Sequence, residues 1–317
     1  MHRFLLLAGK LIVSSALLYI ALLAVDLDAL WVRLGKIDPL LAAYAVAVLI
    51  LQVLIAAWRW LVILRAMSLS APASRIIRIS FIGTFFNQTL PSTIGGDTIR
   101  VWLGGRVTGS WQRTLNTVLI DRLMGLIGLI SIGLAAVLFF RHAVSGLEAI
   151  RIVIWVIAGT TLVLAASFIL GRLVGSRLPD WSVARALDTL CDDARSLVVS
   201  PTGLIVWAQS VAIQGATVVA AWLLSKSVGA AVSLSALFAL VPVVVLVSMA
   251  PVSVAGWGLR EGAMVAAFAL AGLNSSDAFA ISILLGLVLL VVGAIGGLAW
   301  VIGGKPHPFS LPPEKDE

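Results

Sequence analysis

Long apolar runs separated by short polar segments dominate the hydrophobic pattern of the chain. A helix needs about 20 apolar residues to cross a bilayer, and the runs of this length predict six full membrane spans. They cover residues 4–25, 39–64, 114–140, 150–171, 201–224 and 276–303. The strands of a membrane barrel would read as short segments of alternating polarity, which the sequence lacks. The pattern therefore predicts an all-α, polytopic helical membrane protein.

Two further apolar segments are interrupted by proline, glycine and charged residues. In the first, 79–103, the apolar arm 79–90 would form ~18 Å of helix, which is too short to cross a bilayer. The second interruption lies between the apolar stretches 233–250 and 261–273. Non-helical backbone at membrane depth persists only where protein or a water-filled cavity satisfies it. We therefore expect two re-entrant broken helices, each entering and leaving on the same side.

The two interruptions share one spacing. The pattern P-x4-G-x3-R begins at Pro91 and recurs at Pro251, about half the chain later. The unit span–hairpin–span at 39–140 would then reappear inverted at 201–303, an architecture typical of secondary transporters. The alternatives are a chance match of three residues, or segments that cross fully. Full crossing would give eight spans and leave both termini on the same side, so parity does not distinguish the two topologies.

Two segments outside the repeat units differ in composition. Residues 177–199 place apolar positions at helical spacing between charged ones, which predicts an amphipathic surface helix that links the two units. The loop 26–38 has balanced charge, and the polar, proline-rich residues 304–317 are expected to be a disordered tail. The whole chain, 1–317, is then a single transmembrane domain.

Composition and charge support this organisation. The chain has 317 residues, of which 61% are hydrophobic and only 12% charged, whereas a soluble domain carries about twice that charge. With both termini in the cytoplasm, fourteen lysines and arginines fall on the cytoplasmic side and six outside, as the positive-inside rule requires. The net charge of +7 is thus a topology signal, and no nucleic-acid partner is expected. The single Cys191 excludes an internal disulfide and a cysteine metal cluster.

The first interruption combines the groups of an anion receptor. A helix that begins near Asp97 would point its N-terminus into the protein, and Arg100 would lie over the same face. Arginine suits bidentate contact with a phosphate-sized anion. Asp97 is either a helix cap and partner of Arg100, or a group that binds a proton or an amine. The candidate substrate-binding residues here are Asn87, Pro91, Ser92, Gly95, Gly96, Asp97 and Arg100.

The second interruption adds a charge pair, Arg260-Glu261, after glycines that open the backbone. Asp121-Arg122 lies about two turns inside a predicted span, where charges are costly, so both residues are expected to pair either with groups in their surroundings or with these motifs. They serve either transport or a structural ion-pair network. The candidates from these two segments are Asp121, Arg122, Ser253, Gly256, Gly258, Arg260 and Glu261.

Two segments that contain tryptophan each allow two interpretations. In Trp58-Arg59-Trp60, Arg59 is interpreted as a snorkelling arginine in an aromatic belt, with direct ligand binding as the alternative. Trp257 either lines the cavity or anchors the chain at the membrane interface. The three histidines lie in tails or a loop, and no Walker sequence or metal-ligand spacing is present. We expect no metal, no cofactor and no catalytic site, and therefore no enzyme activity.

At these motifs the chain resembles the lysylphosphatidylglycerol synthase transmembrane-region family, which includes the flippase half of the multiple peptide resistance factor. The stretch from Asn87 to Arg100 is similar to its N-x3-P-x3-G-G-D-x2-R signature, and that from Pro251 to Gly262 to its P-x-S-x-x-G-x-G-x-R-E-G signature. Asp121-Arg122 stands where the family usually has Glu-Arg. The resemblance covers nearly the whole chain and implies a lipid-translocating domain of a bacterial or archaeal cell membrane. Full synthase-flippases carry a soluble aminoacyl-transferase domain after their spans, and no such domain precedes Glu317, so synthase activity is not expected.

The function predicted is that of a lipid flippase of the bacterial inner membrane. The headgroup of a phospholipid, glycolipid or hopanoid-type lipid would enter a cavity between the hairpins while its acyl chains stay in the bilayer. Arg100 and Arg260 should then approach one common cavity, and rocking of the repeats would expose it alternately. The alternative is a membrane enzyme or accessory subunit that acts on a lipid-linked sugar, with Asp97, Asp121 or Glu261 as acid or base. A homo-oligomer or a complex with lipid-biosynthesis proteins is a further partner hypothesis.

Overall fold

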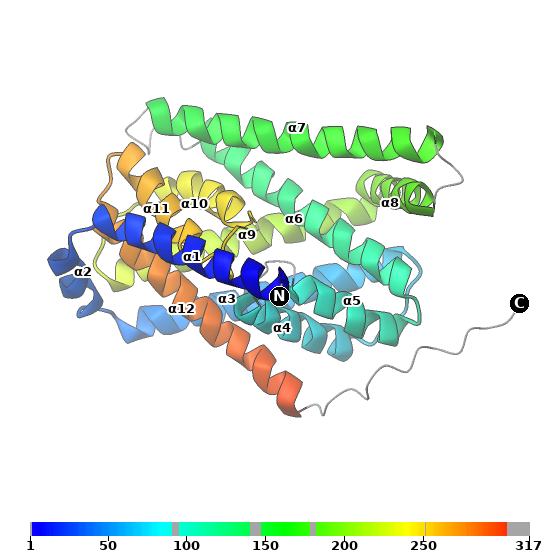
Figure 1. The fold of residues 1–317 in the computed structure, drawn as a ribbon, viewed down its shortest axis with the longest axis horizontal. Coiled ribbons are helices and arrows are strands. Elements are labelled where there is room, and N and C mark those ends of the chain that lie inside the picture. Colours follow the sequence, from blue (N-terminus) through cyan, green and yellow to red (C-terminus); the bar gives the residue numbers. More distant parts are fainter. Residues whose placement is uncertain (1, 91–94, 140–146, 178–181, 251, 303–317) are drawn as a thin grey trace, which may run out of the picture.

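The computed structural model describes residues 2–90, 95–139, 147–177, 182–250 and 252–302 (Figure 1). In these ranges the regular structure is helical throughout, as predicted for an all-α protein. The helices are α1 (His2–Leu23), α2 (Leu27–Leu34), α3 (Pro39–Ala66), α4 (Ala73–Thr89), α5 (Gly95–Thr108), α6 (Trp111–Phe139), α7 (Leu147–Arg177), α8 (Ser182–Val199), α9 (Pro201–Ser227), α10 (Leu234–Ser248), α11 (Leu259–Leu270) and α12 (Ser275–Ile302).

Among the described residues, five helices are long and apolar enough to cross a membrane: α3, α6, α7, α9 and α12. They coincide with five of the six predicted spans, so the chain is a multi-pass membrane protein. The remaining predicted span, 4–25, coincides with α1, in which Ile12–Leu23 forms a shorter apolar helix. The count of six therefore stays a prediction.

Two predicted loops are partly helical. The loop 26–38 contains α2, and an ion pair between Arg33 Nε and Asp277 at 2.9 Å ties this segment to α12. The first interrupted segment, predicted to begin at residue 79, begins earlier, since α4 starts at Ala73, directly after Pro72. Arg78 is thereby part of α4, and its Nη2 donates to the carbonyl of Ala299 at 3.1 Å. Both segments are in contact with α12, which lies far away in the sequence.

The two predicted interruptions do break the helices. α4 ends at Thr89 and α5 begins at Gly95, while α10 ends at Ser248 and α11 begins at Leu259. The four helices have 12 to 17 residues, or about 18–26 Å of helix, which is less than the ~30 Å of a hydrocarbon core. Each interruption therefore leaves helix ends within the protein.

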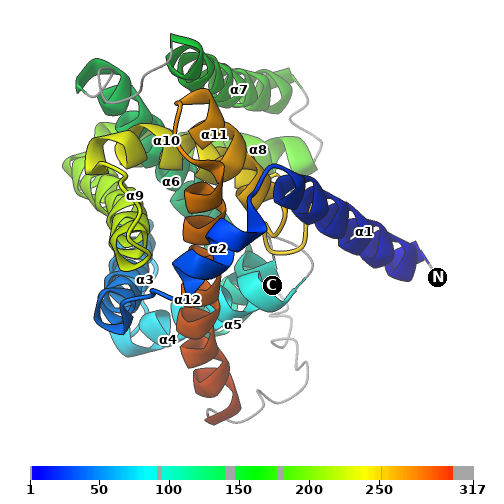
Figure 2. The same cartoon turned by 90° about the vertical axis from the view of Figure 1, so that its left-hand side faces the viewer.

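The helices pack so that the interrupted pairs lie next to spans from the other half of the chain. α4 packs against α12, α10 packs against α6, and α3 packs against α9. Figure 2 shows α12 in the middle of the bundle. In the most apolar window of α12, 61% of the residues are buried, against 6% for α7. α7 is thus a peripheral helix, and it lies along one side of the bundle in Figure 1.

The predicted amphipathic surface helix corresponds to α8, although it begins at Ser182 instead of residue 177. Cys191, Ala194 and Leu197 are buried on one face, and Arg185 and Arg195 are exposed. α8 packs against α7 and α9, which places its apolar face on the bundle.

Candidate functional site

A close approach of two backbones builds the first half of the site. A Cβ on Gly96 would lie 2.1 Å from the carbonyl oxygen of Gly83, so only glycine allows α4 and α5 to meet here. The Gly96 N–H donates to Asn87 Oδ1 at 2.9 Å. This amide is therefore occupied by a side chain and is not open to an anion. The contact holds the N-terminus of α5 against α4.

Asp97, in the first turn of α5, accepts hydrogen bonds from two arginines. Arg122 donates to it twice, from Nε at 2.5 Å and from Nη2 at 2.9 Å, and Arg100 Nη1 lies 3.2 Å away. The interpretation of Asp97 as a partner of Arg100 is thus confirmed. Its role as a proton-binding or amine-binding group stays a prediction.

Asp121 on α6 also accepts hydrogen bonds from two arginines. Arg59 Nε lies 2.8 Å from Oδ1, and Arg100 Nη2 lies 2.9 Å from Oδ2. Arg100 therefore bridges Asp97 and Asp121 and joins α5 to α6. The expectation that the intramembrane charges pair with the motifs is confirmed, and we call these five side chains the arginine network. Its members are Arg59, Asp97, Arg100, Asp121 and Arg122.

The interpretation of Arg59 as a snorkelling residue was wrong. Only 6% of Arg59 is exposed, and its Nη1 donates to Ser210 Oγ on α9 at 2.8 Å. A snorkelling side chain would instead reach water or headgroups. Arg59 points inward because Asp121 offers a buried carboxylate. Direct ligand binding by Arg59 stays a hypothesis.

The second half of the site is built around the start of α11. Gly258 precedes α11 with φ +81°, and a Cβ there would lie 2.4 Å from the carbonyl oxygen of Ser14. The Gly258 N–H donates to Glu261 Oε2 at 2.6 Å, so Glu261 caps its own helix. Its other oxygen, Oε1, accepts from Arg260 Nη2 at 2.7 Å and from Ser282 Oγ at 3.2 Å. The predicted pairing of Arg260 with Glu261 is confirmed.

Each of the two motif arginines stacks on a tryptophan. The Cζ of Arg100 lies 4.4 Å from the ring centre of Trp60, and that of Arg260 lies 4.9 Å from the ring centre of Trp257. Such cation–π contacts hold a guanidinium in place within an apolar setting. Trp257 therefore supports Arg260, which is a role that neither sequence interpretation anticipated.

A cavity of about 640 Å³ lies between the two halves. Both Arg100 and Arg260 line it, although 160 residues separate them. This agrees with the expectation that the two arginines reach one cavity. The predicted site residues that line it are Asn87, Asp97, Arg100, Asp121, Arg122, Gly256 and Arg260.

The other predicted site residues stand behind the cavity wall or are not described. Gly95, Gly96, Ser253, Gly258 and Glu261 are absent from the lining. Of these, Gly96, Gly258 and Glu261 position the residues that do line it. Pro91 and Ser92 lie outside the described residues.

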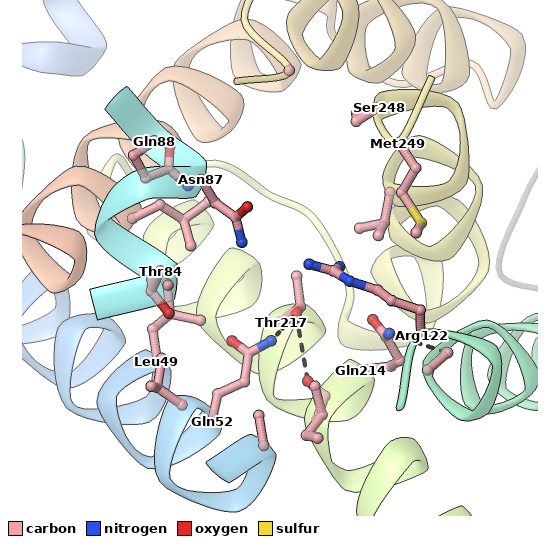
Figure 3. A pocket seen from close by; sticks show the side chains of 18 of the residues that line it. Leu49, Gln52, Thr84, Asn87, Gln88, Arg122, Gln214, Thr217, Ser248 and Met249 are labelled. Atoms are coloured by element: carbon pink, nitrogen blue, oxygen red, sulfur yellow. Dashed lines mark hydrogen bonds between the residues drawn. The ribbon is translucent and has the colours of Figure 1, made fainter. Parts of the chain in front are cut away.

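Arg122 is the most accessible of the four arginines that line the cavity. Its side chain is 40% exposed, against 10% for Arg100 and 8% for Arg260. In Figure 3 its guanidinium points into the cavity toward Asn87 on α4. An anion entering the cavity would therefore meet Arg122 before the two more deeply buried arginines.

Several neutral polar residues of the cavity lining escaped the sequence interpretation. Gln52 on α3 donates from Nε2 to Thr217 Oγ1 on α9 at 2.9 Å (Figure 3). Gln214, also on α9, lines the same wall. Their signal was present, because glutamine inside an apolar span is rare and marks an interior face. No group of three metal-ligand side chains occurs among the described residues.

The comparison with known families agrees with these motifs. The family model described as the lysylphosphatidylglycerol synthase TM region matches residues 7–297, and the chain belongs to this family. No curated protein matches the chain with significant similarity.

Proposed function

We propose that this member of the lysylphosphatidylglycerol synthase TM-region family is a transporter that moves a polar-headgroup lipid between the leaflets of a bacterial inner membrane. The observation that carries the proposal is the arginine-lined cavity between two interrupted helix pairs. Broken helices that meet within the membrane form the substrate sites of many secondary transporters. A volume of about 640 Å³ suits a headgroup.

The walls of the cavity suit a molecule with a polar end and an apolar remainder. Arg100, Arg122 and Arg260 contribute charged groups to the lining. Aliphatic residues such as Leu49 and Val244 also line the cavity. In this proposal the headgroup contacts the arginines and the acyl chains remain in the bilayer.

The packing of the helices supports an inverted repeat of the units 39–140 and 201–303. Suppose that α3, α4, α5 and α6 trade places with α9, α10, α11 and α12, in that order. Every contact observed between two of these eight helices then corresponds to another observed contact or to itself. The contact of α4 with α12 becomes that of α10 with α6, and the contact of α3 with α9 is unchanged. Within the repeat, the two broken pairs are re-entrant, both termini are cytoplasmic, and rocking of one unit against the other exposes the cavity alternately.

The arrangement of the carboxylates favours transport over acid–base catalysis. Asp97 and Asp121 each accept from two arginines, and Glu261 accepts from Arg260 and from the Gly258 amide. A general acid or base needs a proton-accepting atom open to the substrate. Here the arginines occupy the carboxylates, which leaves the guanidinium groups to face the cavity.

The proposal is tested with the purified chain in vesicles that contain lipids labelled on an acyl chain. A membrane-impermeant quencher then measures how fast labelled lipid changes leaflet. We expect faster exchange with the protein than in empty vesicles, and at least tenfold slower exchange in Arg260→Gln, in line with loss of one charge contact. Arg195→Gln is the matched control, because Arg195 is exposed on α8 and does not line the cavity. Exchange no faster than in empty vesicles for every native lipid tested would contradict the proposal.

A further inference from the structure

The guanidinium of Arg260 is held at two of its three nitrogens. Nε donates to Glu261 Oε1 at 3.0 Å and to Ser282 Oγ at 3.3 Å, and Nη2 donates to Glu261 Oε1 at 2.7 Å. Within the described part of the chain Nη1 makes no hydrogen bond, although Arg260 lines the cavity. Nη1 is therefore the nitrogen left for a ligand, and its direction depends on how the other two nitrogens are held.

A glycine of α12 makes the space in which this guanidinium lies. Gly286 is buried and follows the buried Ser282 by one helical turn, so the two residues share a face of α12. A Cβ on Gly286 would lie 2.2 Å from Arg260 Nη2 and 2.8 Å from Trp257 Cη2. Any side chain at position 286 would thus compete for space with the guanidinium and with the ring that stacks on it.

Two other buried glycines of α12 have different neighbours. A Cβ on Gly296 would lie 1.9 Å from the carbonyl oxygen of Phe81, so this glycine allows α12 to approach the backbone of α4. A Cβ on Gly293 would have Gln88 Cγ as its nearest atom, at 3.4 Å, which is ordinary contact. Glycine weakens a helix interior relative to alanine, and at Gly286 the group that accounts for this cost is a guanidinium.

From these contacts we infer that Gly286 is a positioning residue of the site: together with Ser282 it fixes the guanidinium of Arg260 so that Nη1 is presented to the cavity. This role rests on the proposed lipid transport and adds a residue of α12 to it. Alanine at position 286 meets the far end of a long side chain, so it displaces the guanidinium and leaves the backbone in place. Presentation of Nη1 is then lost while folding loses little. A glycine that only allows helices to pack would behave in the opposite way.

The test compares three alanine variants of α12 in the full chain. Exchange of acyl-labelled phosphatidylethanolamine and phosphatidylglycerol is measured in vesicles of these two lipids, and the unfolding midpoint is measured in detergent. We expect Gly286→Ala to slow exchange about tenfold, because a displaced group no longer meets its ligand, while the midpoint falls by a few degrees at most. Gly296→Ala should lower the midpoint much further, because backbone must move, and the matched control Gly293→Ala should keep both values. Gly286→Ala with wild-type exchange, or with a midpoint as low as that of Gly296→Ala, overturns the positioning role.

A second comparison separates the positioning role from the proposed function, because it needs no transport. Arg260→Lys keeps the positive charge but lacks Nη2, the atom nearest to a Cβ at position 286. The midpoint loss caused by Gly286→Ala should therefore be smaller in the Arg260→Lys background than in the wild-type background. An equal loss in both backgrounds overturns the positioning role, whatever the exchange rates are. A loss that depends on Arg260 in a chain that exchanges no lipid overturns the transport proposal alone.

Discussion

The two interrupted helix pairs hold their arginines in different ways. Arg100 contacts two carboxylates, and one of them, Asp121, also holds Arg59 from another helix. Arg260 contacts the carboxylate of its own neighbour in the chain, Glu261, which Ser282 and the Gly258 amide hold in place. The first arrangement shares its charges between helices, whereas the second keeps them within one short segment.

This difference indicates which half responds when the cavity changes shape. The arginine network connects α3, α5 and α6, and Arg59 also reaches Ser210 on α9. A relative movement of these helices must lengthen or exchange at least one of its contacts. The ion pair on α11 lies within one helix, and its contact with another helix is the one to Ser282 on α12. We therefore expect the first half to couple headgroup binding to helix movement, and the second half to act as a fixed contact.

The two halves should differ most in the unfolding free energy that is lost when one carboxylate is removed from each. Asp121→Asn leaves Arg59 and Arg100 without their shared partner in a buried site, which costs about 3–5 kcal/mol of unfolding free energy. Glu261→Gln affects one arginine and keeps an oxygen that can accept from Gly258, so it should cost about 1–3 kcal/mol. Unfolding of the purified variants in mixed micelles measures both values.

An equal loss in the two variants would show that Asp121 is not a shared support. The double variant Arg59→Met with Asp121→Asn provides the control, because it removes the cation that the single variant leaves unpaired. It should be more stable than Asp121→Asn alone. A double variant less stable than the single one would contradict the proposed sharing.

Much of the first half could be read from the sequence, because charges and glycines inside apolar runs have few explanations. The positions of Asp97, Arg100, Asp121 and Arg122 near one another followed from the cost of burying charge. The role of Arg59 did not follow, since the Trp58-Arg59-Trp60 pattern is common at membrane interfaces. Its partner Asp121 is 62 residues away, and a local pattern carries no record of a contact at that distance.

The lengths of the helices were predicted within a few residues, and the errors have one cause. α2 was assigned to a loop and the first turns of α4 were left out of the interrupted segment, because their charged residues are typical of loops. In the structure Arg33 and Arg78 both reach α12, through Asp277 and the carbonyl of Ala299. The neutral wall of Gln52 and Thr217 was overlooked because it lacks charge, although it completes the cavity.

A smaller loss of unfolding free energy should follow when alanine replaces the glycine that each half uses for a close approach of two backbones. Gly96→Ala places a methyl group 2.1 Å from the Gly83 oxygen, and Gly258→Ala places one 2.4 Å from the Ser14 oxygen at positive φ. Each should cost about 1–3 kcal/mol, because backbone must move to make room. Gly262→Ala is the matched control in α11, since no described atom outside its own helix backbone and its chain neighbours lies within 4 Å of its Cβ position. Unfolding midpoints equal to that of the control would refute the close approach.

The smallest losses of unfolding free energy should come from replacing the two tryptophans that support the arginines, and the two losses should differ. Trp257→Phe keeps an aromatic face under Arg260 and should cost less than about 1 kcal/mol. Trp60→Phe keeps the face under Arg100 but loses the bond from Nε1 to Thr117 Oγ1, which is 3.1 Å long and buried. This loss adds about 1 kcal/mol. Thermal unfolding in detergent compares the pair, and a Trp257→Phe variant that is the less stable of the two would reverse the view that the first half is the more interconnected one.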